Sequence, residues 1–308
     1  MEGHVFGPVP SRRLGRSLGV DLVPFKTCSY DCIYCQLGRT SCKTLERKEW
    51  ISIEDVLAEL RCKLATKPDY ITLSGSGEPT LFSRLGELIG RIKVMTDVPV
   101  AVLTNGSLLW REEVRSQLLE ADLVIPSLDA GDPAMFRFVN RPHEDLDFEN
   151  VMDGLVRFGR EFQGEYWLEV FLLGGYTSIK SEVLKLARCA RCINPDRIQL
   201  NTVTRPPAED YAFNVPRERM NELAVMFDPV AEVIADFRGV HQQPEFAAGR
   251  EDVLTLLKRR PCSIEDLSSG LGFHRNEAIK YVEELKSKNL VEEKWVSGRL
   301  YYVAGNDL

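Results

Sequence analysis

Three closely spaced cysteines are the residues of this sequence best suited to chemistry. Cys28, Cys32 and Cys35 lie within residues 25–38, whose sequence is FKTCSYDCIYCQLG. Iron–sulfur clusters are held by thiolates from cysteines that stand close together in a loop. A cube of four irons bound by only three cysteines leaves one iron open to a small molecule. We therefore expect these three residues to ligate a reactive metal centre.

Zinc is the alternative metal for the same loop. A structural zinc site needs four ligands in a tetrahedron, and Cys42, seven residues after Cys35, can supply the fourth. The spacing favours the cluster but does not exclude zinc. Cys189 and Cys192 offer only two ligands on a predicted helix, and we interpret them as small apolar side chains rather than as a second metal site.

Glycine-rich and polar segments follow the next predicted strands. They are SGSGEPT at 74–80, LTNG at 103–106 and SLD at 127–129. Parallel sheets bind ligands at the carboxyl ends of their strands, so we expect these segments to lie near the cysteine loop. Gly75 and Gly77 allow the backbone to approach a ligand closely. The alternative is that the segments form ordinary turns and helix caps.

The elements that must position these residues alternate between strands and helices from residue 17 to 236. This alternation is the pattern of an α/β fold with a parallel sheet. One helix follows Ser52, an N-cap residue with Asp55 three positions later. The predicted strands are 18–23, 70–73, 98–103, 123–125, 167–173, 197–200 and 230–235, and the other predicted helices are 82–94, 148–160, 180–191 and 216–226.

A second, smaller unit is predicted near the C-terminus. Residues 237–249 lack periodicity and contain glycine, proline and polar residues, as linkers do. The order that follows, three helices and a hairpin, is typical of a winged helix. These elements are helices at 251–260, after Ser263 and at 274–287, and strands at 290–295 and 299–303 around Ser297-Gly298. We expect a core over 1–236, a linker over 237–250 and a winged-helix-like domain over 251–308.

Charge and hydropathy limit the partners. The 308 residues include 39 basic and 46 acidic side chains, and the net charge of -7 argues against coating nucleic acid through bulk electrostatics. Residues 10–48 are locally basic, with eight basic and three acidic side chains, and form either a solvated rim or a docking site for an anion. Because the sequence shows no signal core and no membrane span, we expect a cytoplasmic protein with no membrane partner.

The cysteine loop resembles a known signature. Cys28-x3-Cys32-x2-Cys35, with Tyr34 before the last cysteine, is similar to the motif of the radical S-adenosylmethionine (SAM) superfamily, and the segments at 74–80, 103–106 and 127–129 follow in that superfamily's order. The resemblance covers residues 5 to about 236. It implies a partial (β/α)6 TIM-like barrel of the radical SAM type, followed here by the winged-helix-like domain.

The resemblance also implies two cofactors, a [4Fe-4S] cluster and SAM. The three cysteines would bind the cluster, and the open iron would bind the amino and carboxylate groups of SAM. The cofactor-binding residues that it implies are Tyr34 near the adenine, Gly75, Ser76, Gly77 and Glu78 at the amino end, Asn105 with Thr104 as support, and Ser127 and Asp129 at the ribose hydroxyls.

The activity implied by the resemblance is reductive cleavage of SAM to a 5'-deoxyadenosyl radical, which abstracts hydrogen from a substrate, as an iron–sulfur oxidoreductase does. In such enzymes the cofactors carry the chemistry, while the protein binds, orients and shields. A flavodoxin or ferredoxin would supply the low-potential electron. Because these donors are commonly acidic, the basic segment 10–48 is the expected docking site. The resemblance assigns no catalytic residue of the chain itself.

The substrate class stays open among RNA, a peptide and a small molecule. Residues 73–81, 127–130 and 140–142 most resemble the wyosine-synthase-like group (tRNA imidazoguanosine synthetase-like), whose members modify a guanosine in tRNA. That group uses further N-terminal cysteines, and this chain has none before Cys28. Candidate substrate contacts are Glu169, Asn201, Arg205 and Arg141.

A metal-containing regulator that binds through the winged helix is the competing functional class. Residues 251–308 contain nine basic and ten acidic side chains, so charge gives this tail no preference for nucleic acid over protein.

Overall fold

A mostly parallel sheet forms the centre of the protein. The computed structural model describes residues 3–235, 250–271, 275–296 and 298–305. The sheet has the strand order β1-β2-β5-β6-β7-β8-β9-β10; β1 is antiparallel to β2, and every other neighbouring pair is parallel. The strands are β1 (Val5–Ser11), β2 (Gly15–Val20), β5 (Tyr70–Leu73), β6 (Val100–Thr104), β7 (Leu123–Pro126), β8 (Glu165–Leu172), β9 (Arg197–Thr202) and β10 (Glu232–Val233). The predicted α/β class is confirmed.

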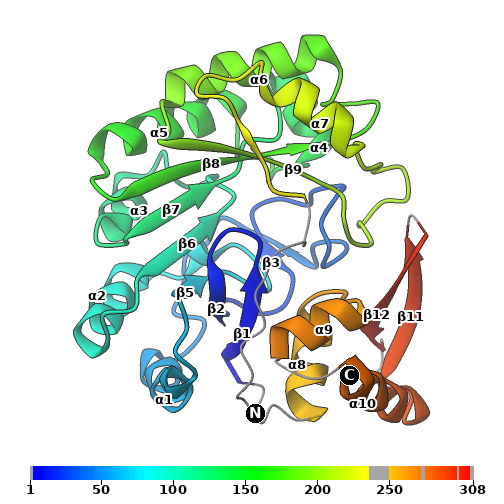
Figure 1. Cartoon of the computed structure of the whole chain (residues 1–308). Helices are drawn as coiled ribbons and strands as arrows, with labels where there is room; N and C mark the ends of the chain where they lie inside the picture. Colours follow the sequence, from blue (N-terminus) through cyan, green and yellow to red (C-terminus); the bar gives the residue numbers. More distant parts are fainter. Residues whose placement is uncertain (1–2, 236–249, 272–274, 297, 306–308) are drawn as a thin grey trace.

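Amphipathic helices connect the parallel strands and cover the outer face of the sheet (Figure 1). In α1 (Ile53–Lys63), the Ser52 hydroxyl accepts a hydrogen bond from the Asp55 amide, the predicted N-cap, and Val56 and Leu60 are fully buried. The other helices of this unit are α2 (Leu85–Met95), α3 (Glu112–Leu118), α4 (Pro133–Val139), α5 (Phe148–Glu161), α6 (Lys180–Ile193) and α7 (Arg217–Ala224), with short 3-10 turns η1 (Leu64–Thr66) and η2 (Pro79–Leu81).

The sheet curves far enough for the turn of the β1–β2 hairpin to reach β8 and β9. Arg12 donates a hydrogen bond of 2.8 Å to Asn201, and Arg13 donates to Gln199 and forms an ion pair with Glu169. The neighbouring Leu14 packs inside the curve. Its apolar partners there are Ala101, Leu123, Ile125 and Trp167. The hairpin turn therefore joins the β1–β2 end of the open sheet to β8 and β9 near its other end.

The C-terminal unit packs on the outer strand β1. It consists of α8 (Arg250–Arg259), α9 (Ile264–Leu271), α10 (Arg275–Ser287) and the antiparallel pair β11 (Val291–Val296) and β12 (Arg299–Ala304). Its helices share a second hydrophobic core with Phe6 and Val9 of β1, which lies beside it in Figure 1. The predicted linker residues 237–249, His274 and Ser297 lie outside the described residues.

Several element predictions need correction. Strand β1 is not predicted, because Gly7, Pro8 and Pro10 break the strand pattern; an edge strand tolerates proline, since one side of its backbone lacks a strand partner. The strand expected at 18–23 is β2, which begins at Gly15 and ends at Val20, and the strand expected at 230–235 is only the two-residue β10. Helices α3 and α4, of seven residues each, are too short to give a periodic signal. No helix in the described ranges has the length and apolarity to cross a bilayer.

Candidate functional site

The cysteine loop (residues 25–38) follows β2 and is held by apolar side chains between the cysteines. Tyr30 and Ile33 are 3% and 0% exposed, and the Ile33 amide donates to the carbonyl of Val139 at 3.0 Å. Cys28, Cys32 and Cys35 all line one cavity of about 410 Å³. The loop therefore presents its three thiols to a common space, as the sequence predicts.

Cys42 does not join this group. Strand β3 (Thr27–Cys28) pairs in parallel with β4 (Cys42–Lys43), with Thr27 opposite Cys42 and Cys28 opposite Lys43. Because side chains alternate along a strand, Cys42 points to the face opposite Cys28, and it is exposed.

A single metal ion finds no ready ligand set in the described part of the chain. No group of three His, Cys, Asp or Glu side chains there is arranged to hold one. A tetrahedral zinc site with Zn–S bonds of roughly 2.3 Å would bring its sulfurs to about 3.8 Å from one another. A cube spreads its ligands over separate irons and needs no such convergence. The three thiols therefore fit a cluster better than a zinc ion.

The environment of the three thiols favours the binding of a cation such as a metal centre. Burial raises the pKa of Cys28 to about 12, with a further contribution from Glu78, and burial also raises the pKa of Cys32 and of Cys35. Thiolates form in such a place only when a cation compensates their charge, as a bound metal does. Two amides approach the sulfurs: the Nδ2 groups of Asn105 and Asn140 lie 3.5 Å from the Sγ atoms of Cys28 and Cys32.

The glycine-rich segment after β5 lies directly against the cysteine loop. A Cβ atom on Gly77 would lie 1.8 Å from the carbonyl oxygen of Thr27, so only glycine fits there. Gly75 has a φ of +148°, and a Cβ atom on it would meet Asp21. Both the amide and the hydroxyl of Ser76 donate to Asp21. Packing within the chain therefore requires glycine at both positions, whether or not a ligand is bound.

Glu78 is a buried link between two strand ends. Its carboxylate accepts hydrogen bonds from the amide and hydroxyl of Thr80, from the Thr104 hydroxyl at 2.6 Å and from the Asn105 amide at 2.7 Å. Burial raises the pKa of Glu78, while these bonds oppose the shift. The side chain is 2% exposed and fastens the segment after β5 to the segment after β6.

Tyr34 and Asp129 form a second buried link. The Tyr34 hydroxyl and the side-chain amide of Asn140 both donate to the Asp129 carboxylate. The Tyr34 ring stacks on the Phe171 ring with centroids 3.9 Å apart. Burial raises the pKa of Asp129 to about 6, against the effect of these two donors. This network fixes the Tyr34 ring in the wall of the cavity.

The predicted site residues therefore fall into two groups. Cys28, Cys32, Cys35, Tyr34, Gly75, Ser76, Gly77 and Ser127 line the cavity. Glu78, Asn105 and Asp129 are absent from its described lining and contact residues that form it. Among the substrate candidates, Glu169, Asn201 and Arg205 line the cavity, whereas Arg141 pairs with Glu209 outside it.

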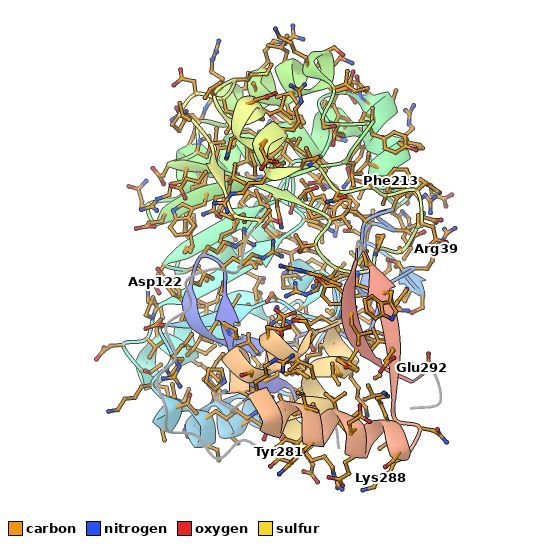
Figure 2. All side chains as sticks on the ribbon, turned by 45° about the vertical axis from the view of Figure 1, so that its right-hand side comes forward. Arg39, Asp122, Phe213, Tyr281, Lys288 and Glu292 are labelled. Carbon is orange, nitrogen blue, oxygen red and sulfur yellow. The ribbon has the colours of Figure 1, made fainter. Side chains whose placement is uncertain are left out.

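The basic segment 10–48 does not form one surface. Arg12 and Arg13 turn into the cavity, whereas Arg39 has a side chain 60% exposed and lies at the edge of the molecule in Figure 2. Sequence reasoning gave no role to Asn140, or to Arg259 and Arg260 of the C-terminal unit, although both arginines line the cavity. Only Asn140 had a signal, its place in the motif at 140–142.

Comparisons with known proteins show the family and the fold of this chain. The sequence model of the radical SAM superfamily matches residues 22–190. The UPF0026 protein of Methanocaldococcus jannaschii is 33% identical over 97% of this chain and 95% of its own length. A radical SAM methyltransferase from Sphaerobacter thermophilus has a similar fold, with a TM-score of 0.55 at 17% identity over 73% of this chain and 67% of its own.

Another relative is much longer than this chain. The protein named GTPase Obg from Brachyspira hyodysenteriae is 40% identical over 97% of this chain, but the chain spans only 45% of that relative. The phosphate-binding loop of many GTPases contains a Gly-Lys pair, and this sequence has none.

Proposed function

Since this chain belongs to the radical SAM superfamily, whose members bind a [4Fe-4S] cluster and SAM, we propose that its cavity is the active site of a radical SAM enzyme. When bound, the reduced cluster and SAM supply a 5'-deoxyadenosyl radical that abstracts hydrogen from a substrate. The observation that carries the proposal is the common cavity lined by Cys28, Cys32 and Cys35, with Cys42 pointing away.

The chain's own residues would bind and position these cofactors. Cys28, Cys32 and Cys35 hold the cluster. Tyr34, Ser127 and the backbone of residues 75–77 contact SAM, because they line the cavity beside the thiols. In this arrangement Glu78, Asn105 and Asp129 are positioning residues, since their polar groups are engaged by the chain itself.

The substrate and the electron donor are also matters of proposal. Residues 73–81, 127–130 and 140–142 support the wyosine-synthase-like group and hence RNA as the substrate, with an oxidoreductase reaction; a peptide or small molecule is the alternative. A flavodoxin or ferredoxin is the proposed donor, and the exposed part of the basic segment, including Arg39, supports its docking at the rim.

The remaining parts of the proposal concern organisation. We place the domain boundary in residues 237–250 and assign the winged-helix type to the C-terminal unit, because three helices precede a hairpin there. The eight free cysteines support a reducing compartment, the cytoplasm.

Anaerobic reconstitution tests the proposed function. The protein should take up about four irons per chain and release 5'-deoxyadenosine from SAM on reduction. Incubation with bulk tRNA and, separately, with a peptide pool should then show a mass change in one of them. Tight binding of one zinc ion without SAM cleavage would instead favour the metal-containing regulator.

A further inference from the structure

One wall of the cavity is strongly cationic. Its described lining contains six basic side chains and a single carboxylate, that of Glu169. The six are Arg12, Arg13, Lys26, Arg205, Arg259 and Arg260. They come from the β1–β2 turn, the cysteine loop, the segment after β9 and the end of α8, so the C-terminal unit contributes to the wall.

Described carboxylates contact three of these six side chains. Glu169 pairs with Arg13, and Asp21 accepts a hydrogen bond of 2.7 Å from Arg259. Asp266 of α9 lies 3.9 Å from Arg205, at the outer limit of an ion pair. These contacts fix the positions of Arg13, Arg259 and Arg205.

Arg12, Arg205 and Arg260, which we call the arginine wall, lie close enough to repel one another. Burial and the charges of Arg205, Arg13 and Arg260 lower the pKa of Arg12 to about 9, although Glu169 opposes this effect. Burial and the charge of Arg260 also lower the pKa of Arg205. The Nε and Nη2 atoms of Arg260 are buried and have no hydrogen-bond acceptor in the described structure.

Such an arrangement is costly unless an anion completes it. A buried guanidinium group loses its hydration, and like charges add to the cost. The planar forks of arginine match the oxygens of phosphate and carboxylate groups, which can satisfy several N–H donors at once. Arg205 also donates to Gln36, the residue after Cys35, which places the arginine wall next to the cysteine loop.

We propose that the arginine wall binds an oxyanion group of the substrate, a phosphate or a carboxylate, and so holds the substrate beside the cluster. This inference rests on the proposed function, because it assigns the rest of the cavity to the cofactors. None of the three arginines lies in the segments that resemble the SAM-binding motifs. The proposed anion site is therefore distinct from the proposed SAM site.

The test uses the full chain, reconstituted anaerobically and saturated with SAM. Calorimetry at low ionic strength measures the affinity for inorganic phosphate and, separately, for succinate. We expect one of the two to bind, which identifies the oxyanion, and we expect R260Q and R12Q each to weaken that binding at least tenfold. The matched control is R250Q, at the other end of α8, where Arg250 pairs with Glu284 on the surface; its affinity should equal that of the wild type.

Melting temperatures show which variants are folded, and R12Q carries the test if R260Q fails to fold. The inference is overturned if neither anion binds the SAM-loaded protein, or if both arginine variants bind as the wild type does. Binding that SAM abolishes would also overturn it, because the arginine wall would then serve the SAM carboxylate. SAM cleavage is measured in parallel: absent cleavage with intact anion binding counts against the proposed function and leaves the anion site standing.

Discussion

The two sides of the cavity bury charges of opposite sign and differ in how the chain compensates them. On the cofactor side, formed by the cysteine loop and the segments after β5, β6 and β7, buried carboxylates such as Glu78 and Asp129 accept hydrogen bonds from the chain itself. On the other side, the arginine wall gathers three guanidinium groups, and the Nε and Nη2 atoms of Arg260 have no acceptor in the described structure. In the proposed function, a cofactor site built from hydrogen bonds within the chain therefore faces a substrate site whose gathered positive charge lowers the stability of the fold.

The largest effect should follow from removing a cluster ligand. The variant C32A should lose most of its iron, from about four per chain to fewer than one, and should not cleave SAM, because the cavity then offers only two of its three thiols. Iron analysis and 5'-deoxyadenosine release measure this. The matched variant C42A should retain both, since Cys42 points away from the cavity; loss of iron in C42A would contradict the ligand assignment.

The next effect tests the contact between the glycine-rich segment and the cysteine loop. The variant G77A should lose about 3 kcal/mol of unfolding free energy, because its Cβ atom would overlap the Thr27 carbonyl beside Cys28. Denaturant unfolding measures this loss.

A glycine in a helix gives the matched control. Gly90 lies within α2, and a Cβ atom on it would lie 3.1 Å from the flexible end of the Glu120 side chain. Because alanine favours the helix more than glycine does, G90A should gain up to about 1 kcal/mol of unfolding free energy. If G77A unfolded with the same free energy as the wild type, the glycine-rich segment would not be tightly packed against the cysteine loop.

Removing a charge from the arginine wall should stabilise the fold, whereas G77A should destabilise it. In the absence of added anions, R12M should raise the unfolding free energy by about 1 kcal/mol, because it removes a buried charge that its neighbours repel. Asn201, which accepts from Arg12, keeps a second donor, the Thr202 amide.

The pH dependence gives a further check on this variant. The pKa of Arg12 is lowered to about 9 in the folded state. The charged Arg12 side chain therefore destabilises the fold fully at pH values below 9, and this destabilisation declines as the pH rises above about 9, because the folded protein then releases the proton. The advantage of R12M should shrink over that range in thermal or denaturant unfolding. A stability loss in R12M at pH 7 would remove the contrast between the two sides.

The smallest effect concerns the two amides near the sulfurs. Removal of an N–H donor that stabilises the more negative, reduced cluster should lower its midpoint potential in N105A and N140A. A net hydrogen-bond energy of about 1 kcal/mol corresponds to a shift on the order of 40 mV. Redox titration followed by electron paramagnetic resonance measures it, and N150A, on the surface of α5, should show none.

Local sequence was sufficient to predict which segments meet around the three thiols. The three cysteines fall within eight residues, and the segments at 74–80, 103–106 and 127–129 each follow a strand, so chain connectivity alone places them at one edge of a parallel sheet. The roles of Glu78 and Asp129 were less accessible, because their hydrogen-bond partners come from neighbouring strand ends and from Asn140.

By itself, the sequence determined the α/β class, most of its strands and helices, and a three-thiol loop suited to a cluster. Only the tertiary structure decided that Cys42 faces away, because strand register sets that side-chain direction. It alone also joined Arg12, Arg205 and Arg260, residues that lie far apart in the chain, since the curvature of the sheet and the packing of the C-terminal unit on β1 bring them together. Short-range patterns record chemistry within a loop, whereas a charged wall built from three distant segments leaves no periodic or local signal.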